Sequence, residues 1–314
     1  MIRPIAMKLV SALVGLWVLT VVTFLMIHLI PGSLEDALLG TADVTPEARA
    51  AINHEYGLDQ PLYVQYSTWL SNTLHGNLGN SSVSGQPVLS AVAEKLPVSL
   101  QLAAVGVMIA IIMALILGVG AAFNQGGWID RVASLFAVVG TSVPDFVIGL
   151  FLIIIAVRFF AGFPTEGYAP LTDGLDEWFK HIILPGLTLA LGLLGLLTRL
   201  TRSAVINTLR EEYVRTARGK GLRWHTMLIH HVLKPSLIPI VTAAGLQLVA
   251  IIGGVVVVEY VFSIPGLGSL ILSSIHNRDY PMVQAATLGI GVFAIVVSLM
   301  VDTLHRWLDP RVTD

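Results

Sequence analysis

The sequence predicts an all-α protein that crosses a membrane six times, with both termini on the cytoplasmic side. Hydrophobic residues make up 55% of the 314-residue chain and charged residues only 12%, whereas about 25% of the residues of a soluble domain are charged. Six apolar stretches each approach the ~20 residues that a helix needs to cross a ~30 Å hydrocarbon core. These stretches are residues 9–30, 98–123, 132–157, 182–200, 237–262 and 281–304. Together they predict a single transmembrane domain over residues 1–314.

The basic residues set the predicted orientation, because the cytoplasmic loops of membrane proteins carry an excess of Lys and Arg. Six spans place both termini on one side, and 13 of the 18 Lys and Arg residues fall on that side, which leaves 5 on the other. Eight of the 13 lie between Arg199 and Lys234, in a single loop. The termini and this loop are therefore expected to face the cytoplasm.

The first apolar stretch follows two basic residues, Arg3 and Lys8, as the apolar core of a secretory signal peptide does. Its apolar run of about 22 residues exceeds the ~7–15 of a signal peptide, and LIPGSLED after it is a poor cleavage site. We therefore expect a retained first span.

A long extracytoplasmic segment, residues 31–97, is expected between the first two spans. Thr45 with Pro46 and Glu47 favours a helix start, because each suits the first turn of a helix. Apolar side chains then recur at near-helical spacing: Leu62, Tyr66, Trp69 and Leu70. This segment could lie on the membrane with its rings at headgroup level, or form a lid over a transport path. Residues 87–97 are expected to form a short amphipathic helix before the second span.

The second span carries small residues at every fourth position: Gly106, Ala110, Ala114, Gly118 and Ala122. In a membrane, such a stripe lets helix backbones approach closely and gain van der Waals contact. The stripe is therefore expected either to pack against another helix of the bundle or to line a substrate path.

Two acidic residues in apolar surroundings are candidates for a translocation path. Asp145 follows Pro144 inside the third stretch, where proline kinks a helix and a charged residue costs about 2.5–3.5 kcal/mol on insertion scales. Its carboxylate could face a water-filled cavity and bind a cationic substrate group or a proton. Alternatively, it could hydrogen-bond a neighbouring helix end or sit near a membrane interface. Glu259 precedes a Pro- and Gly-containing turn, residues 265–268, that must be satisfied by protein or water. Glu259 could face the path or anchor the free amides of this turn.

The sequence offers no catalytic or metal-binding motif. It has no cysteine, no H-E-x-x-H, no G-x-S-x-G and no G-x-x-x-x-G-K-[ST] phosphate loop. The adjacent His230 and His231 would diverge by about 100° on a helix, so they cannot converge on one metal ion. We therefore expect a protein that is not an enzyme, holds no metal or cofactor and has no nucleic-acid partner.

The basic loop, residues 207–235, is predicted to contain a short helix. Residues 208–211 match the T-x-x-E form of a capping box, so the helix is expected to begin near Leu209. It is expected to end at Gly219 or Gly221, because glycines commonly terminate helices.

Ala217 and Gly221 lie four residues apart and would leave a smooth patch among basic side chains. Attraction to anionic lipid, worth about 1 kcal/mol for each basic residue, explains the charges but not the small residues. A smooth patch suits close approach by another protein. The loop is therefore expected to dock a partner protein.

Several segments of the sequence occur together in one family. They are LIPGSLEDALLG after the first stretch, YGLDQPLYVQYSTWL and HGNLGNSSVSGQPV in the outer segment, SVPDFVIGL around Asp145, EEYVRTARGKGL in the basic loop, VEYVFSIPGLGSLILSSIHNRDYPMVQ and the terminal LDPRV. With them the chain resembles, nearly end to end, the membrane subunits of the dipeptide/oligopeptide/nickel class of ATP-binding-cassette importers. The resemblance is to the permease usually encoded first of the two, and it implies an importer-type permease fold in a bacterial cytoplasmic (inner) membrane.

The resemblance also implies that the basic loop contains a coupling helix that sits in a groove of an ATPase subunit. Permeases of such importers carry an E-A-A-x-x-x-G motif there. Gly221 matches the motif glycine and Ala217 the second alanine, whereas Thr216 and Arg215 stand at the first alanine and the acidic position. Glu212 is a further candidate contact with the ATPase.

The partners implied by the resemblance are a second, similar permease, two ATPase subunits, an extracytoplasmic solute-binding protein and membrane lipid. ATP-driven closure of the ATPase dimer would move the coupling helix and open the path outward. Short peptides are the expected cargo, with nickel chelates, heme or another small solute as alternatives. An ion-coupled secondary transporter, with Asp145 and Glu259 as proton sites, and a membrane scaffold or receptor without transport are the alternatives from other classes.

Overall fold

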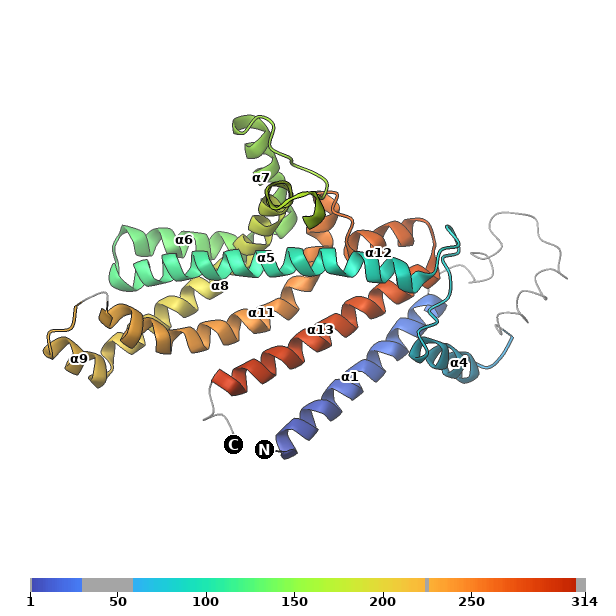
Figure 1. The fold of residues 1–314 in the computed structure, drawn as a ribbon, viewed down its shortest axis with the longest axis horizontal. Coiled ribbons are helices and arrows are strands. Elements are labelled where there is room, and N and C mark those ends of the chain that lie inside the picture. The colour runs from blue at the N-terminus through green and yellow to red at the C-terminus, as the bar shows by residue number, and fades with distance from the viewer. Residues whose placement is uncertain (1, 30–58, 224–225, 309–314) are drawn as a thin grey trace. The chain divides into compact units, whose positions relative to one another are not determined.

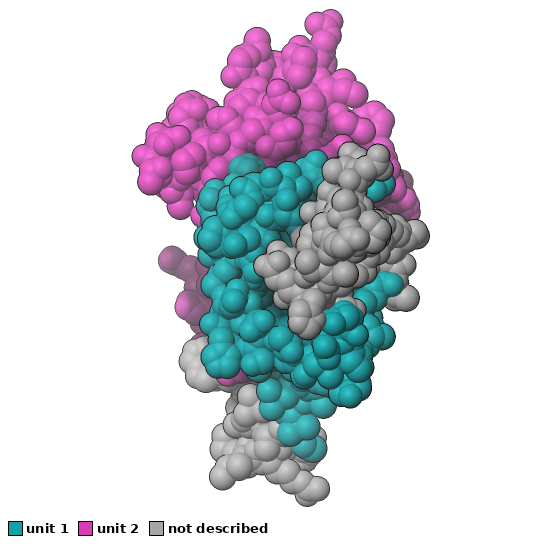
Figure 2. Space-filling view, turned by 90° about the vertical axis from the view of Figure 1, so that its right-hand side faces the viewer, with its two compact units in different colours: residues 1–98, 265–296 teal, residues 99–264, 297–314 magenta. Residues whose placement is uncertain are grey.

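The computed structural model describes residues 2–29, 59–223 and 226–308. Within these ranges every regular element is a helix (Figure 1), so the all-α prediction is confirmed for the described chain. The chain divides into two compact units (Figure 2). The first comprises residues 1–98 and 265–296, and the second comprises residues 99–264 and 297–314.

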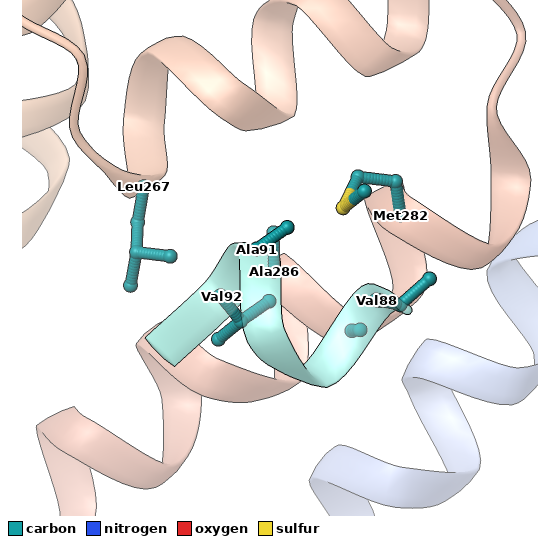
Figure 3. Close-up of a cluster of buried hydrophobic side chains, with 7 residues drawn as sticks. Val88, Ala91, Val92, Leu267, Met282 and Ala286 are labelled. Atoms are coloured by element: carbon teal, nitrogen blue, oxygen red, sulfur yellow. The ribbon is translucent and has the colours of Figure 1, made fainter. Parts of the chain in front are cut away.

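The first unit combines the N-terminal helices with the turn before the last helix. It contains α1 (Ile2–Leu29), α4 (Leu62–Leu74), the start of α5 (Val88–Phe123), α12 (Leu267–His276) and the start of α13 (Tyr280–Leu308). Its buried apolar cluster, shown in Figure 3, is formed by Val88, Ala91 and Val92 of α5, Leu267 of α12, and Met282, Ala285 and Ala286 of α13. The alanines let the helix backbones approach closely, because no long side chain separates them.

The start of α5 differs from the expected separate helix over residues 87–97. α5 is continuous from Val88 to Phe123, with Pro97 inside it. Proline removes one backbone donor from a helix. The buried side chains of Val88 and Val92 hold the first turns of α5 in the apolar cluster, so the helix continues through the proline.

Aromatic rings join α4 to α1. The ring of Phe24 contacts that of Tyr66 edge-on, with centroids 5.4 Å apart, and that of Trp69 at 5.8 Å. The Tyr66 hydroxyl also lies 2.9 Å from the Thr20 hydroxyl. The predicted helical spacing from Leu62 is therefore confirmed as α4. The predicted helix start at residues 45–47 lies outside the described residues.

A buried aspartate fixes the loop that precedes α5. Asp279, only 5% exposed, accepts hydrogen bonds from the Ser81 hydroxyl and from the backbone amide of Ser82. The Ser81 hydroxyl in turn accepts hydrogen bonds from the amides of Val83 and Ser84. One carboxylate thus holds the loop between α4 and α5 to the turn between α12 and α13.

The second unit is built around α8. It contains the rest of α5, α6 (Trp128–Ser142), α7 (Asp145–Phe159), η1 (Leu171–Asp173), α8 (Leu175–Arg210), α9 (Glu212–Gly219), the π-helical η2 (Met227–Leu233), α11 (Lys234–Val261) and the end of α13. α8 packs against α6, α7 and α11. α6 and α7 point in clearly different directions (Figure 1).

The predicted spans coincide with apolar helices of the structure. Three described helices are long and apolar enough to cross a membrane: Val88–Phe123, Leu175–Arg210 and Tyr280–Val301. There are five if each of two bent pairs is one span: α6 with α7, bent by 114°, and Met227–Leu237 with Pro239–Leu248, bent by 42°. The apolar part of α1, Val10–Met26, is shorter. The count of six spans and the cytoplasmic termini stay predictions.

The stripe of small residues on α5 packs against α8. All five stripe residues are buried. A Cβ at Gly106 would lie 2.9 Å from the Cβ of Leu189, and a Cβ at Gly118 would lie 2.6 Å from the Cβ of Thr201. These separations are too short for real Cβ contacts, so glycine is required at both positions. The stripe therefore serves helix packing, the first of the two expected alternatives.

Candidate functional site

A single extended residue, Glu211 (φ −63°, ψ 143°), separates α8 from α9. The predicted helix start near Leu209 is wrong, because Thr208 still belongs to α8. Its carbonyl accepts a hydrogen bond from the Glu211 amide (3.1 Å), and its hydroxyl lies 3.0 Å from the Ser236 hydroxyl. The loop helix begins after Glu211, and its predicted end at Gly219 is confirmed.

The inner face of α9 is anchored in an apolar cluster, which we call the loop anchor. It consists of Ala122, Val205, Val214, Met227 and Val232. Val214 is only 1% exposed, and burying a valine side chain contributes roughly 1.5–3 kcal/mol. α9 is therefore attached to the helices of its own chain.

Ala217 lies on this inner side of α9 and is only 7% exposed. The expected smooth patch of Ala217 with Gly221 is therefore wrong. Residues three apart share one face of a helix, so Ala217 turns inward with Val214, whereas Gly221 lies beyond the helix end.

The outer face of α9 carries three of the expected contact residues. Glu212, Arg215 and Thr216 are exposed, and spacings of three and four place them on one face. Gly221 follows the helix with φ +75°, and no atom of the described residues lies within 4 Å of a Cβ built there. A side chain at this position would be strained by the backbone but would project into open space.

Tyr213 ties α9 to η2. Its hydroxyl donates a hydrogen bond to the backbone carbonyl of His231 at 3.1 Å. Burial, and then the negative charge of Glu211, raise the pKa of this hydroxyl above its ordinary value. The tyrosine therefore stays a protonated donor at neutral pH, and the tie is kept.

Asp145 is the first residue of α7, at the break after α6. Its half-buried carboxylate lies against the backbones of two other helices. A Cβ at Gly192 of α8 would lie 2.4 Å from Oδ1, and a Cβ at Gly254 of α11 would lie 2.7 Å from Oδ2. The carboxylate is therefore packed against both glycines, and a methyl group at either position would require it to shift.

Glu259 is fully buried near the end of α11. The hydroxyl of Ser99 on α5 donates a hydrogen bond to Oε1. Its backbone carbonyl accepts a hydrogen bond from the amide of Ile264 at 2.8 Å. This environment favours an anchoring role for Glu259 over exposure to a path.

Sequence reasoning missed an ion pair that joins α6 to α8. Arg202 donates from Nε to Oδ1 of Asp130 at 2.7 Å and from Nη2 to Oδ2 at 2.9 Å. The amide of Gly126 also donates to Oδ2 at 2.9 Å. The sequence shows only an acidic residue before one apolar stretch and, 72 positions later, an arginine after another apolar stretch. In the sequence, Arg202 contributes only to the excess of basic residues on the predicted cytoplasmic side.

Family profiles cover both parts of the chain. "Binding-protein-dependent transport system inner membrane component" matches residues 106–314, and the profile of the N-terminal part of such membrane components matches residues 1–103. A protein of Sinorhizobium fredii named "Probable peptide ABC transporter permease protein" is 36% identical over 310 residues, which cover 99% of this chain and 97% of that protein. A glutathione transport system permease protein of Shigella flexneri is 36% identical over 317 residues, with 99% of each chain covered.

A solved structure agrees at the level of the fold. A chain from the crystal structure of an amino acid ABC transporter with histidines matches with a TM-score of 0.53 at 15% identity, covering 69% of this chain and 94% of that chain. The predicted permease fold is thus confirmed, and the chain is a multi-pass protein of the inner membrane and the membrane subunit of an importer. It belongs to the family of binding-protein-dependent transport system inner membrane components.

Proposed function

We propose that this chain forms half of the translocation path of an ATP-driven importer for short peptides. The relatives support this cargo, since one is named for peptide transport and another for transport of glutathione, which is a tripeptide. Nickel chelates, heme and other small solutes are the alternatives. A solute-binding protein would make the choice by delivering the cargo.

The complete importer would contain a second, similar permease and two ATPase subunits, with the solute-binding protein outside. The name of the family supports a binding protein. The sequence contains no phosphate loop, which supports placing ATP hydrolysis on separate subunits. This chain would then supply path and mechanical linkage only.

The observation that carries the coupling role is the two-sided packing of α9. Its inner side chains, Val214 first, are buried in the loop anchor, while Glu212 and Arg215 on the outer side are exposed. A helix that is fixed to the helices of its own chain and has exposed charged side chains on its outer face is suited to transmit motion from a bound ATPase to those helices. Thr216 and Gly221 would complete the surface against the ATPase, and Ala217 would act from beneath by allowing close packing.

In the proposed cycle, closure of the ATPase dimer on ATP displaces α9. α8 moves with α9, because Val205 of α8 and Val214 of α9 share the loop anchor. The path then opens outward and receives the peptide from the binding protein. ATP hydrolysis releases the closed dimer and resets the path.

Asp145 is the proposed contact for the cationic group of the cargo, since a free peptide carries an N-terminal ammonium group. Its half-buried carboxylate lies at a break between helices, where intramembrane ionisable residues commonly mark a pathway. A proton is the alternative ligand. Glu259 is the second candidate on the path. It is fully buried beside Ser99, which favours a structural role behind the path over direct contact with the cargo.

The first test is uptake of radiolabelled di- and tetrapeptides by cells that carry either this chain or its Gly221→Arg variant as sole copy. The variant is expected to reach the membrane normally, and its peptide uptake is expected to fall at least about tenfold. A loss of this size lies in the range that typical coupling free energies produce. The reason is that a long cation would project from the surface on which the ATPase should dock.

Two control variants separate bulk from backbone strain. Gly221→Ala keeps the positive φ but adds one methyl group. Gly162→Arg adds the same cation at φ +84° in a turn where no atom of the described residues lies within 4 Å of a Cβ. Both are expected to retain uptake. Full uptake by the Gly221→Arg variant would overturn the docking role, whereas no peptide uptake by the native chain would point to nickel chelates, heme or another solute.

A further inference from the structure

The pair of Asp130 and Arg202, here called the α6–α8 clasp, has the geometry of a strong ion pair. Each carboxylate oxygen accepts from a different guanidinium nitrogen, at 2.7 and 2.9 Å. Asp130 is 9% exposed, and its Oδ2 is also held by the Gly126 amide. A two-pronged arginine–carboxylate pair fixes direction as well as distance. The clasp thus sets the position of α6 along α8.

The clasp closes one end of a close-packed antiparallel contact. A Cβ at Gly140 of α6 would lie 2.2 Å from the carbonyl oxygen of Leu191 on α8. A Cβ at Gly195 of α8 would lie 2.4 Å from the carbonyl oxygen of Ala137 on α6. From Gly140 to Ala137 along α6, the facing residue on α8 changes from Leu191 to Gly195. The clasp continues this antiparallel register. The two backbones therefore touch from the break before α7 down to the clasp.

The glycine contacts and the clasp oppose a shift between the two helices in different ways. A shift along the helix axis would bring larger residues to the places where Gly140 and Gly195 meet backbone carbonyls, so the glycine contacts oppose large shifts. Van der Waals contact is not directional, however. The clasp is directional, since the guanidinium fork matches the carboxylate in one orientation. It therefore adds a directional bond that resists a shift of α6 along α8.

The helices joined by the clasp lead to the two functional regions. α8 continues from Arg202 to Arg210, next to α9. α6 runs from Asp130 to the break after which Asp145 begins α7. A link between α8 and α6 therefore lies between the coupling loop and the intramembrane carboxylate.

We propose that the clasp makes α6 move with α8, so that displacement of α9 reaches the break at Asp145. Asp130 and Arg202 are then positioning residues of the transport cycle. The proposal rests on the proposed function, because it requires α9 to be the element that the ATPase moves.

The test uses the complete importer in proteoliposomes, with its binding protein and radiolabelled alanyl-alanine. The readout is dipeptide transported per ATP hydrolysed, measured in the same vesicles for Asp130→Asn, Arg202→Gln and the double variant. Each single variant is expected to assemble and to hydrolyse ATP at the native rate, with a ratio about tenfold lower, as for the loss of a typical coupling. The double variant is expected to be no worse than either single variant, because the two residues act as a unit.

Two further variants serve as controls. Asp176→Asn removes one of the two exposed partners of Lys180 on the same helix as Arg202, and it is expected to leave the ratio unchanged. Arg202→Lys keeps the charge but loses the fork, and it is expected to give an intermediate ratio. An unchanged ratio in the clasp variants would overturn the proposal. A fall in transport that is fully explained by a smaller amount of assembled complex would also overturn it. So would a ratio in the double variant that falls by the product of the two single-variant losses.

A second readout does not depend on the cargo. Spin labels on Leu135→Cys of α6 and Ser203→Cys of α8, both exposed positions, report the distance between the helices with and without ATP. The distance is expected to stay constant in the native background and to change on ATP binding in the Arg202→Gln background. A change in the native background, or none in the variant, would contradict the clasp. Failure of the native complex to carry alanyl-alanine would count only against peptide cargo.

Discussion

Two distant glycines leave room for the carboxylate of Asp145. Gly192 and Gly254 belong to different helices, and a Cβ on either would meet a different oxygen of the same carboxylate. A methyl group added at either position would therefore require the carboxylate to shift. A neighbour of one of them, Gly253, provides a natural comparison, because no atom of the described residues lies within 4 Å of a Cβ built there.

Replacing Gly254 with alanine should destabilise the protein, whereas replacing Gly253 should not. Overpacking costs about 1–3 kcal/mol, while alanine in a helix gains up to about 1 kcal/mol over glycine. Gly254→Ala is therefore expected to lower the midpoint of thermal unfolding in detergent, and Gly253→Ala to leave it equal or higher. Combining Gly254→Ala with Asp145→Ala should restore most of the loss. Equal behaviour of the two glycine variants would show that the carboxylate is not packed against Gly254 as tightly as the structure has it.

Residue-level prediction from the sequence succeeded where the cause was local. The break before Asp145 followed from Pro144, because the effect of proline acts on neighbouring residues. The contact of the Asp145 carboxylate with the two glycines could not be predicted, since it depends on which faces of α8 and α11 meet α7. The clasp was missed for the same reason, because nothing local marks Arg202 as the partner of Asp130.

Among the helices, α9 shows how a short element can be held in place without a side-chain cap. No side-chain hydrogen bond caps its start, and eight residues are too few for a stable isolated helix. Its stability must come from the loop anchor, through Val214, and from the bond of Tyr213 to His231. The helix is thus a tertiary feature more than a local one.

Truncating Val214 should loosen α9 specifically. Val214→Ala removes part of a buried side chain, at a cost of about 0.8 kcal/mol for each buried CH₂ equivalent. Backbone amides of residues 212–219 are expected to exchange hydrogen faster in the variant, by roughly tenfold for each 1.4 kcal/mol lost. Thr216→Ala on the exposed face should leave the exchange nearly unchanged. Equal protection in Val214→Ala and the native chain would show that the anchor does not hold the helix.

The basic loop, residues 207–235, shows how far a sequence motif can predict the bounds and orientation of a helix. The helix end was predicted, because a glycine in the left-handed region commonly follows a helix, as Gly221 at φ +75° does two residues after Gly219. The start was wrong, because the apparent cap Thr208 is used inside α8 and faces Ser236. The inward position of Ala217 also escaped prediction, since the surrounding cluster comes from three other elements, α5, α8 and η2.

For the whole molecule, the uneven distribution of charge was the most informative property of the sequence. Low overall charge and apolar stretches predicted a helical membrane protein, and the concentration of basic residues around α9 predicted the loop that is proposed to meet the ATPase. The family profiles and the fold confirm the importer subunit. The central proposal is that the outer face of α9 is where this subunit meets its ATPase.

The most direct test of this proposal is site-directed photocrosslinking. The chain contains no cysteine, so a single introduced cysteine that carries a benzophenone group marks one position uniquely. A label at Thr216→Cys, on the outer face of α9, is expected to crosslink to the ATPase subunit in a transport-competent complex, in a way that changes with ATP. A label at Leu175→Cys, exposed at the far end of α8, is expected not to reach it. Absence of the crosslink at Thr216 in an active complex, or equal crosslinking from both positions, would contradict the account.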